Sequence, residues 1–411
     1  MQLLVPPRLI VVAYAVAPGP GGPESQVNLE LLRALAAHWP SGVTVISGGG
    51  PPAMSIPPGW RVHALGEHGP SALAGAAVRG LRRGALPVRA VEKLVHLRTG
   101  QGIKMLSWQR AASRILEFEL DRDPDAVVWS RALPFASIGA VAAVRRPLRW
   151  IVNVNDPMPP GVWPNLYAFD PHADRRTRER FAAAIPRISA LTFPSSRLRD
   201  LELAAFPELA KAPSEVLPHI ARERKNGGPP PSRKLRIAFG GTLRKDRARP
   251  ELAEVLALLP AICQDLEISF HLARPTPFAE GYAAGLPARI VLEEDEEALA
   301  RSLAEADVLL DLECEADRPL LLTKVVNYLA AGRPIWSLCA PESTARDLVE
   351  EGWGYASPLG DPAAVAETLA RIHGDWSRGD LEARVPSAAL RERFSAKRQV
   401  ELLLGLLERM V

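Results

Sequence analysis

The chain has 411 residues, of which 47% are hydrophobic and 24% are charged, and its formal net charge is only +3. This length is too great for one ordinary hydrophobic core, so we expect two soluble globular domains. So small a net charge does not indicate a nucleic-acid partner. The three cysteines are far apart, which excludes a disulfide framework or a zinc-site spacing. There is no signal-peptide pattern and no apolar run of membrane-spanning length, so we expect a cytoplasmic protein.

The first half of the chain alternates strand-like and helix-like segments. Residues 8–14 are a β-branched run typical of a buried parallel strand, and a loop rich in Gly and Pro follows at 15–25. An amphipathic helix is expected at 24–38. Further strands are expected at 43–46, 126–130, 148–154, 190–193 and 215–218, with a helical stretch at 98–120. This alternation predicts a doubly wound parallel sheet.

Residues 221–233 have the composition of a linker, and the strand–helix alternation restarts after them. Strands are expected at 234–239, 267–272, 289–292, 308–312 and 334–338, and helices at 250–259, 296–305, 321–331, 343–351, 362–373 and 386–410. The predicted fold class is α/β, with two Rossmann-like doubly wound domains, 1–220 and 234–385, facing a central cleft. The closing segment, 386–411, is expected to be a helix that can pack back toward the first domain. Ligands of such sheets bind beyond the carboxyl ends of the strands.

A glycine turn with trailing cations follows the first strand of the second half. The turn is Gly240, Gly241 and Thr242, and the cations are Arg244, Lys245, Arg247 and Arg249. Backbone N–H groups freed by glycine, together with these cations, are suited to hold a diphosphate. The alternative is a tight turn followed by solvated arginines.

The expected helix 321–331 carries a second group of polar residues. Lys324, Asn327 and Tyr328 stand at i, i+3 and i+4, so they share or border one helical face. A lysine and an amide at the front of a helix are suited to an anionic, hydroxyl-rich ligand. On spacing alone, a packed helix with solvated polar residues explains them equally well.

In the first half, the candidate residues are a glycine loop, Gly21, Gly22 and Glu24, and the carboxylate of Asp156. Asp156 follows the expected strand 148–154, where a carboxylate can orient or deprotonate a hydroxyl, although an Asp-Pro turn is the competing interpretation. The loop lacks the G-x-G-x-x-G spacing, so a dinucleotide fingerprint is not supported. The histidines are scattered, with none paired at metal spacing, and no metal site is expected.

Taken in order, these segments resemble the family-four glycosyltransferases of the GT-B fold over nearly the whole chain. Thr323-Lys-Val-Val-Asn-Tyr-Leu-Ala-Ala-Gly-Arg-Pro334 is similar to the family segment S-K-x-x-E-Y-x-A-x-G-x-P, which contacts the nucleotide sugar. Gly241-Thr-Leu with Arg247 resembles the family's phosphate loop, and the segment 150–157 resembles its first-domain strand that ends in Asp-Pro. Gly21-Gly-x-Glu24 is similar to the glycine loop near the acceptor.

The resemblance implies transfer of a sugar from a nucleoside diphosphate donor to an acceptor hydroxyl, with retention at the anomeric carbon and without a metal or other cofactor. The second domain would bind the donor and the first domain the acceptor. Lys324 and Arg247 would neutralise the diphosphate leaving group, and Asp156 would act on the acceptor. The implied donor-binding residues are Gly240, Gly241, Thr242, Arg244, Lys245, Thr323, Asn327 and Tyr328.

Two positions depart from the family pattern. Asn327 stands where a glutamate commonly bonds the ribose, and the family's other glutamate falls on Pro319. An amide still bonds a diol but brings no charge. Two alternatives to a transferase that builds a cell-surface glycan or glycolipid therefore stay open. One is a nucleotide-sugar epimerase that hydrolyses its donor, and the other is a non-catalytic nucleotide-sugar-binding scaffold protein.

A basic stretch from Arg79 to Arg114 contains seven Arg and two Lys against one acid, Glu92. The cations are mixed with apolar residues. One hypothesis is contact with an anionic membrane at the inner face of the plasma membrane, or with a lipid-linked acceptor. The other is a helical region with a solvated cationic face.

Overall fold

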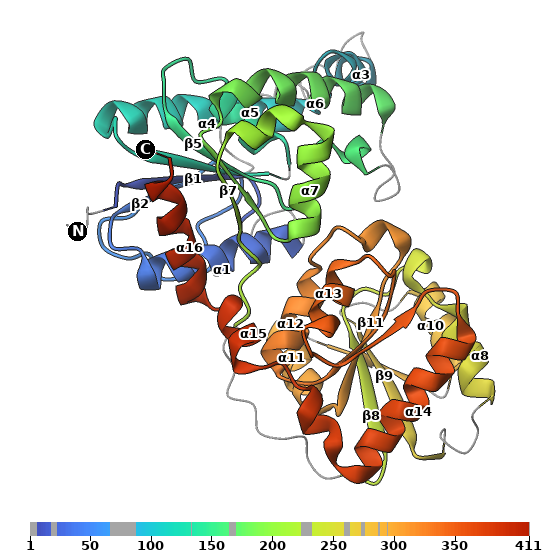
Figure 1. The fold of residues 1–411 in the computed structure, drawn as a ribbon. Helices are drawn as coiled ribbons and strands as arrows, with labels where there is room; N and C mark the ends of the chain where they lie inside the picture. The colour runs from blue at the N-terminus through green and yellow to red at the C-terminus, as the bar shows by residue number, and fades with distance from the viewer. Residues whose placement is uncertain are drawn as a thin grey trace. The chain divides into compact units, whose positions relative to one another are not determined.

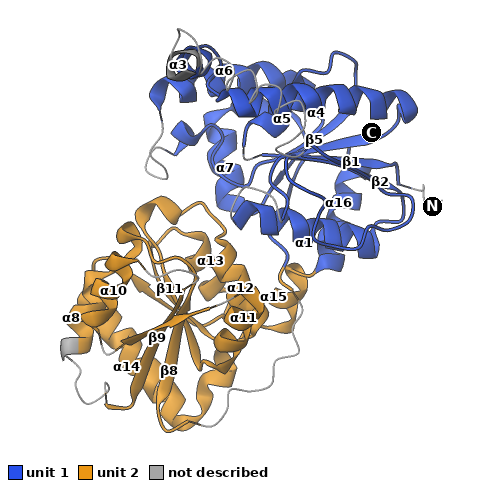
Figure 2. Ribbon diagram, turned by 180° about the vertical axis from the view of Figure 1, so that it is seen from behind, with its two compact units in different colours: residues 1–220, 396–411 blue, residues 221–395 orange. Residues whose placement is uncertain are grey.

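The chain divides into two compact α/β units, residues 1–220 with 396–411, and residues 221–395 (Figure 2). The computed structural model describes residues 6–17, 23–65, 88–132, 134–163, 170–222, 232–258, 264–272, 276–286, 288–293 and 295–410. Gly21 and Gly22, residues 79–87 of the basic stretch and most of the expected linker lie outside these ranges.

The first unit contains a parallel sheet with the order β3-β2-β1-β4-β5-β6-β7 among the described residues. Its strands are β1 (Leu9–Ala13), β2 (Val43–Ser47), β3 (Arg61–Ala64), β4 (Val127–Arg131), β5 (Arg149–Asn153), β6 (Ala190–Phe193) and β7 (Ser214–Val216). Strands β1, β2, β4 and β6 are buried along their whole length, which explains their continuous apolar sequence.

Helices cover both faces of this sheet (Figure 1). The described helices of this unit are α1 (Pro23–His38), α3 (Val88–Thr99), α4 (Ile103–Arg122), α5 (Ala136–Ala142), α6 (Pro171–Ala184), α7 (Ser196–Ala205) and α16 (Ala396–Glu408), of which α3 packs against α6 and α4. Side chains of α4, α5, α6 and α7 pack into the core on one face. On the other face, α16 lies beside α1, and its buried Val400, Leu403 and Leu406 join the core. The end of the chain is therefore part of the first unit.

The second unit repeats the same topology, with the order β10-β9-β8-β11-β12-β13 within the described residues. Its strands are β8 (Leu235–Gly240), β9 (Leu266–Leu272), β10 (Ala288–Leu292), β11 (Val308–Leu312), β12 (Ile335–Cys339) and β13 (Tyr355–Pro358), all in parallel pairs. The helices are α8 (Pro250–Leu258), α10 (Pro277–Ala284), α11 (Glu296–Glu305), α12 (Thr323–Ala331), α13 (Thr344–Glu350), α14 (Pro362–Arg378) and α15 (Ala388–Arg393). Helices α8, α10 and α14 pack on one face, and α11, α12, α13 and α15 contribute to the core on the other.

Two expected helices are interrupted. The stretch predicted at 98–120 contains the end of α3 and most of α4, separated at Gly100, whose φ of +72° is left-handed. A Cβ at Gly100 would approach the carbonyl oxygen of Ala173 to 2.7 Å, so a side chain is excluded there. The closing helix predicted at 386–410 is likewise two helices, α15 and α16, which belong to different units.

Candidate functional site

Both sheets reverse their strand order at one point, between β1 and β4 in the first unit and between β8 and β11 in the second. In open parallel sheets, ligands bind beyond the carboxyl ends of the strands beside such a switch point. Polar side chains lie at this edge of both sheets, although in the first unit they come from the end of β4, from α1 and from the loop after β5. Each unit therefore has one candidate site, and the two are described in turn.

In the second unit, β8 ends in the predicted glycine loop, and Tyr328 fixes this loop from the interior. The Gly240 N–H donates to the Tyr328 hydroxyl over 2.8 Å, and that hydroxyl lies 3.0 Å from the carbonyl oxygen of Leu310. Gly241 has a φ of +124° and donates its N–H to the carbonyl oxygen of His271. Tyr328 is 0% exposed. It therefore holds the loop in place from the interior of the unit.

Lys324 lies in the first turn of α12, and its ammonium is engaged within the protein. Nζ is 2.5 Å from Oδ1 of Asp311, donates to the carbonyl oxygen of Leu312 over 2.6 Å, and lies over the Phe239 ring at 5.3 Å. The side chain of Lys324 is 11% exposed and that of Asp311 is 0% exposed. This ion pair is consequently shielded from solvent, so dissolved ions weaken it less than they weaken an ion pair at the surface.

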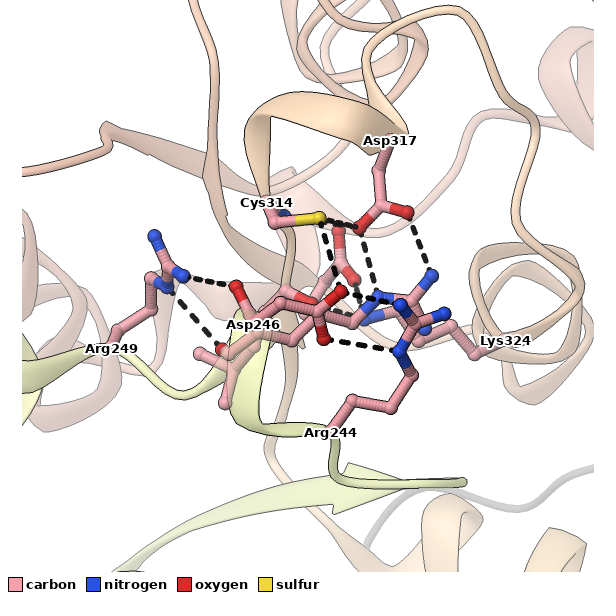
Figure 3. Close-up of polar contacts among 9 residues, drawn as sticks. Arg244, Asp246, Arg249, Cys314, Asp317 and Lys324 are labelled. Carbon is pink, nitrogen blue, oxygen red and sulfur yellow. Dashed lines mark hydrogen bonds and ion pairs between the residues drawn. The ribbon is translucent and has the colours of Figure 1, made fainter. Parts of the chain in front are cut away.

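Arg247 is held in the same manner by Asp317, which lies beside Cys314 in Figure 3. Its Nε and Nη2 donate to the two carboxylate oxygens over 2.9 and 2.7 Å, which is the bidentate geometry that guanidinium groups also use for phosphate. Burial alone would raise the pKa of Asp317, but the bonds from Arg247 outweigh burial and lower it. Asp317 therefore stays ionised, and it also accepts hydrogen bonds from the backbone N–H and the thiol of Cys314.

Glu313 is the fifth residue of this cluster. We call it the second-unit cluster, and its residues are Asp311, Glu313, Asp317, Lys324 and Arg247. Glu313 follows β11 and is 1% exposed. Burial, then the charges of Asp311 and Asp317, raise its pKa well above the ordinary value. Burial of this kind favours the uncharged form of a carboxyl.

The other predicted donor-binding residues lie around this cluster. Thr242, Lys245 and Asn327 are exposed, and Thr323 is partly exposed. Arg244 pairs with Asp246, with Nε 3.0 Å from Oδ1. The structure thus brings Lys324 and Arg247 to one set of buried acids, Asp311, Glu313 and Asp317.

In the first unit, Glu24 lies in the first turn of α1 and is held by two amides. Asn155 Nδ2 donates to both carboxylate oxygens, over 2.7 and 2.8 Å, and Asn28 Nδ2 donates to Oε1 over 3.0 Å. Burial raises the pKa of Glu24 to about 8, opposed by the charge of Arg131 and supported by that of Asp156. The predicted residues Glu24 and Asp156 are therefore electrostatic neighbours at the carboxyl edge of the sheet.

Arg131, the last residue of β4, is a buried cation that sequence reasoning missed. Its Nε donates to Asn28 Oδ1 over 2.7 Å, and its guanidinium lies 5.2 Å from the Trp129 ring. Among the described residues it has no ion pair, and burial lowers its pKa to about 10. With His219 and Gln399 it lines a cavity of about 20 Å³. Burial, then Arg131, lower the pKa of His219 to about 3, so this imidazole is neutral.

Among the described residues, no group of three or more His, Cys, Asp or Glu side chains is arranged to hold a metal ion. In the same part of the chain, no helix combines the length and the apolar character needed to cross a bilayer.

Known proteins were compared with the chain at the levels of sequence and structure. No family model matches the sequence, and no curated protein matches it. The fold, by contrast, matches solved structures over 98% of this chain. The UDP-forming α,α-trehalose-phosphate synthase of Burkholderia xenovorans, in complex with glucose-6-phosphate, is 14% identical over 100% of its own length, with a TM-score of 0.62.

Two further solved structures are similar to the same extent. HepE of Anabaena, in complex with UDP and glucose, is 12% identical over 99% of its length with a TM-score of 0.61. The sucrose-phosphate synthase of Thermosynechococcus elongatus is 15% identical over 98% of its length, also with a TM-score of 0.61. At these identities the likeness shows the fold, and it confirms the GT-B class of two Rossmann-like units that the sequence predicted.

Proposed function

We propose that the protein is a glycosyltransferase that transfers a sugar from a nucleoside diphosphate donor to an acceptor hydroxyl. The observation that carries this proposal is the match of nearly the whole chain to solved proteins named as sugar-phosphate synthases or bound to UDP-sugar components. The polar clusters at both topological switch points support it, because they stand where this class of fold binds ligands.

The two clusters suggest a division of roles. The second unit would bind the donor, with the glycine loop beside the diphosphate and Lys324 and Arg247 stabilising charge on the leaving group. The first unit would bind the acceptor, with Glu24 and Asp156 near its hydroxyl. We further propose retention at the anomeric carbon without a metal ion.

A panel of UDP-, GDP-, dTDP- and ADP-sugars tests this function. We expect one of these donors to raise the melting temperature and to release its nucleoside diphosphate faster when extracted lipid or glycan acceptors are added. Release that does not depend on an acceptor would favour the hydrolysing epimerase instead. Stabilisation of the protein by a donor without any turnover would refute transfer.

One observation favours the non-catalytic scaffold as a second candidate. Both cations that a diphosphate needs, Lys324 and Arg247, are already paired with buried carboxylates. In addition, the exposed Asn327 brings no charge toward a ribose. A scaffold would bind a nucleotide sugar and turn over none of the panel, so the same experiment separates the two candidates.

We propose that the acceptor belongs to a cell-surface glycan or glycolipid and that the protein works at the inner face of the membrane. Helices α3 and α4 support this proposal, since Leu94, Leu97 and Phe118 are exposed on them. These helices also carry a groove of about 320 Å³, which both apolar and cationic side chains line. Its lining residues are Val95, Ile103, Leu106, Ser107, Arg110, Ala111 and Arg114. Such a surface is suited to anionic lipid.

Pelleting with vesicles that contain anionic lipid tests this contact. We expect binding that weakens as salt rises and that falls when Arg110 and Arg114 are both changed to Glu. The matched control changes Lys397 and Arg398 to Glu, which are exposed on α16. Equal pelleting of both double variants would sink the membrane proposal.

A further inference from the structure

The cations of the second-unit cluster are paired within the protein without a ligand. Lys324 and Arg247 face the carboxylates of Asp311 and Asp317 in contacts of 2.5 to 2.9 Å. Burial raises the pKa of the third carboxyl, Glu313, well above its ordinary value. The two cations that would meet a diphosphate are therefore already neutralised by side chains of the protein.

Other titratable groups that face the cluster do not change this pairing. Asp246, on the loop after β8, is bonded by Arg244, so this exposed pair is neutral as a whole. Burial raises the pKa of the Cys314 and Cys339 thiols, which are consequently uncharged. The hydroxyl of Ser337 donates to Asp311 Oδ2 over 2.7 Å.

A diphosphate and these carboxylates compete for the same donors. Asp317 takes two N–H groups of Arg247 in the fork geometry that a phosphate would use, and Asp311 takes the ammonium of Lys324. If a ligand drew the cations away, the carboxylates would remain in an interior where they are 1% and 0% exposed. An ionised carboxylate without a partner is strongly disfavoured there, and it takes up a proton instead.

We propose that Asp317 and Asp311 are specificity-determining residues of the donor site: they act as internal anions, and a nucleoside diphosphate replaces them only when protons are taken up. This inference rests on the proposed function, because it assumes that the donor binds at Lys324 and Arg247. It adds that the site discriminates against highly charged ligands as pH rises. Glu313, buried beside them, is the third carboxyl that shares these protons.

The direction of the pH dependence follows from linkage. The bound complex holds more protons than the free protein, so the affinity for a diphosphate increases as pH falls. If one proton is taken up per ligand, the dissociation constant rises by up to about tenfold for each pH unit. Uptake is measured directly by titration calorimetry in buffers of different ionisation enthalpy.

The experiment uses the full chain, with UDP and inorganic pyrophosphate as probes at pH 6 and pH 8. Wild-type protein is expected to take up protons and to bind both probes at least tenfold more weakly at pH 8. Asp317→Asn keeps the volume of the side chain but removes the charge that holds Arg247. We expect it to bind UDP about tenfold more tightly than wild type at pH 8, with less proton uptake. Asp311→Asn provides the same test at Lys324.

The matched control is Asp307→Asn, which breaks a bidentate pair with Arg236 at the amino ends of β8 and β11, away from the site. It should leave the affinity for UDP and the proton uptake unchanged. The inference is overturned if the folded Asp317→Asn and Asp311→Asn variants bind UDP no better than wild type at pH 8, or if wild type takes up no protons. Coupled binding without sugar transfer would refute the proposed function while leaving this inference intact.

Discussion

The two units share the strand order around the switch point, and each carries a polar cluster there. The clusters differ in whether their opposite charges are in direct contact. In the first unit, Arg131 and Glu24 are separated by the amide of Asn28, which bonds both. In the second unit, cations and carboxylates touch directly, as in the pair of Arg247 and Asp317. Topology therefore fixes where polar groups gather, and local pairing decides how they ionise.

This difference is visible in the direction of the pKa shifts. Where amides intervene, burial dominates, and it raises the pKa of Glu24 to about 8 and lowers that of Arg131 to about 10. Where the partners touch, the ion pair outweighs burial, and the pKa of Asp317 falls below its ordinary value. The first unit thus holds a carboxyl whose pKa is raised to about 8, whereas the second holds directly paired charges and one carboxyl, Glu313, whose pKa burial raises.

The largest effect is expected from Lys324→Ala, which breaks an ion pair of the second-unit cluster. It leaves Asp311 buried without its cation, and loss of one partner of such a pair costs about 3 kcal/mol of unfolding free energy. UDP binding should fall about 100-fold, since a charge-assisted contact to the diphosphate is lost as well. Chemical denaturation and calorimetry measure the two effects.

A double variant separates stability from binding at this position. Lys324→Met combined with Asp311→Leu removes both charges, so it should recover much of the lost stability without recovering UDP binding. The exposed Lys397→Ala on α16 is the control and should change neither property. Normal UDP binding by Lys324→Ala would mean that the donor site lies elsewhere.

The next effect is expected from Tyr328→Phe, which tests how the glycine loop is held. Removing the hydroxyl leaves the buried N–H of Gly240 without its acceptor, at a cost of about 1–3 kcal/mol. The fold should persist, because the ring still fills the core. Tyr355→Phe removes a hydroxyl that bonds Asp375 and not the loop, so it serves as a comparison. Of the two variants, only Tyr328→Phe should weaken UDP binding. If both variants bind UDP equally well, the glycine loop does not bind the diphosphate.

A smaller, pH-dependent effect is expected from Glu24→Gln in the first unit. The folded protein holds this carboxyl protonated up to about pH 8, whereas the unfolded chain releases the proton near 4.5. Wild-type stability therefore falls as pH rises through this window, and the variant should lose that slope. We expect Glu24→Gln to gain on the order of 1 kcal/mol relative to wild type between pH 5 and pH 8.

Denaturation at several pH values measures this slope. Glu202→Gln is the matched comparison, because burial also raises the pKa of Glu202 to about 8, and it should remove a slope of the same sign. Only Glu24 lies at the proposed acceptor site, so only its substitution should alter the KM for an acceptor. Parallel pH curves for Glu24→Gln and wild type would show that Glu24 titrates normally.

The sequence predicted most central strands because a buried parallel strand is continuously apolar. The runs at 190–193 and 308–312 coincide with β6 and β11. It missed β3 and β13, which are short strands at the sheet edges with mixed composition, Arg-Val-His-Ala and Tyr-Ala-Ser-Pro. These two segments lack the continuous apolar run that marks a buried parallel strand in the sequence.

The sequence predicted where the candidate site residues lie along the sheets, but not which of them are in contact. Spacing after strands located Lys324, Arg247, Glu24 and Asp156 at carboxyl edges, but it did not show which charges touch. That information depends on tertiary packing, which brings Asp317 to Arg247 across 70 residues of sequence. Arg131 carried a usable signal, because it ends an apolar run just as Asp156 follows one.

Asn327 gives the smallest expected effect and the sharpest comparison with the family pattern. Its side chain is exposed on α12, so Asn327→Glu should change the unfolding free energy by no more than about 0.5 kcal/mol. If a ribose lies against this face, the new carboxylate forms a charge-assisted bond to its hydroxyls and tightens UDP binding several-fold. Pyrophosphate has no ribose, so its affinity should stay unchanged or fall slightly through repulsion. Equal changes for the two ligands would mean that Asn327 senses only charge, and that the ribose lies elsewhere.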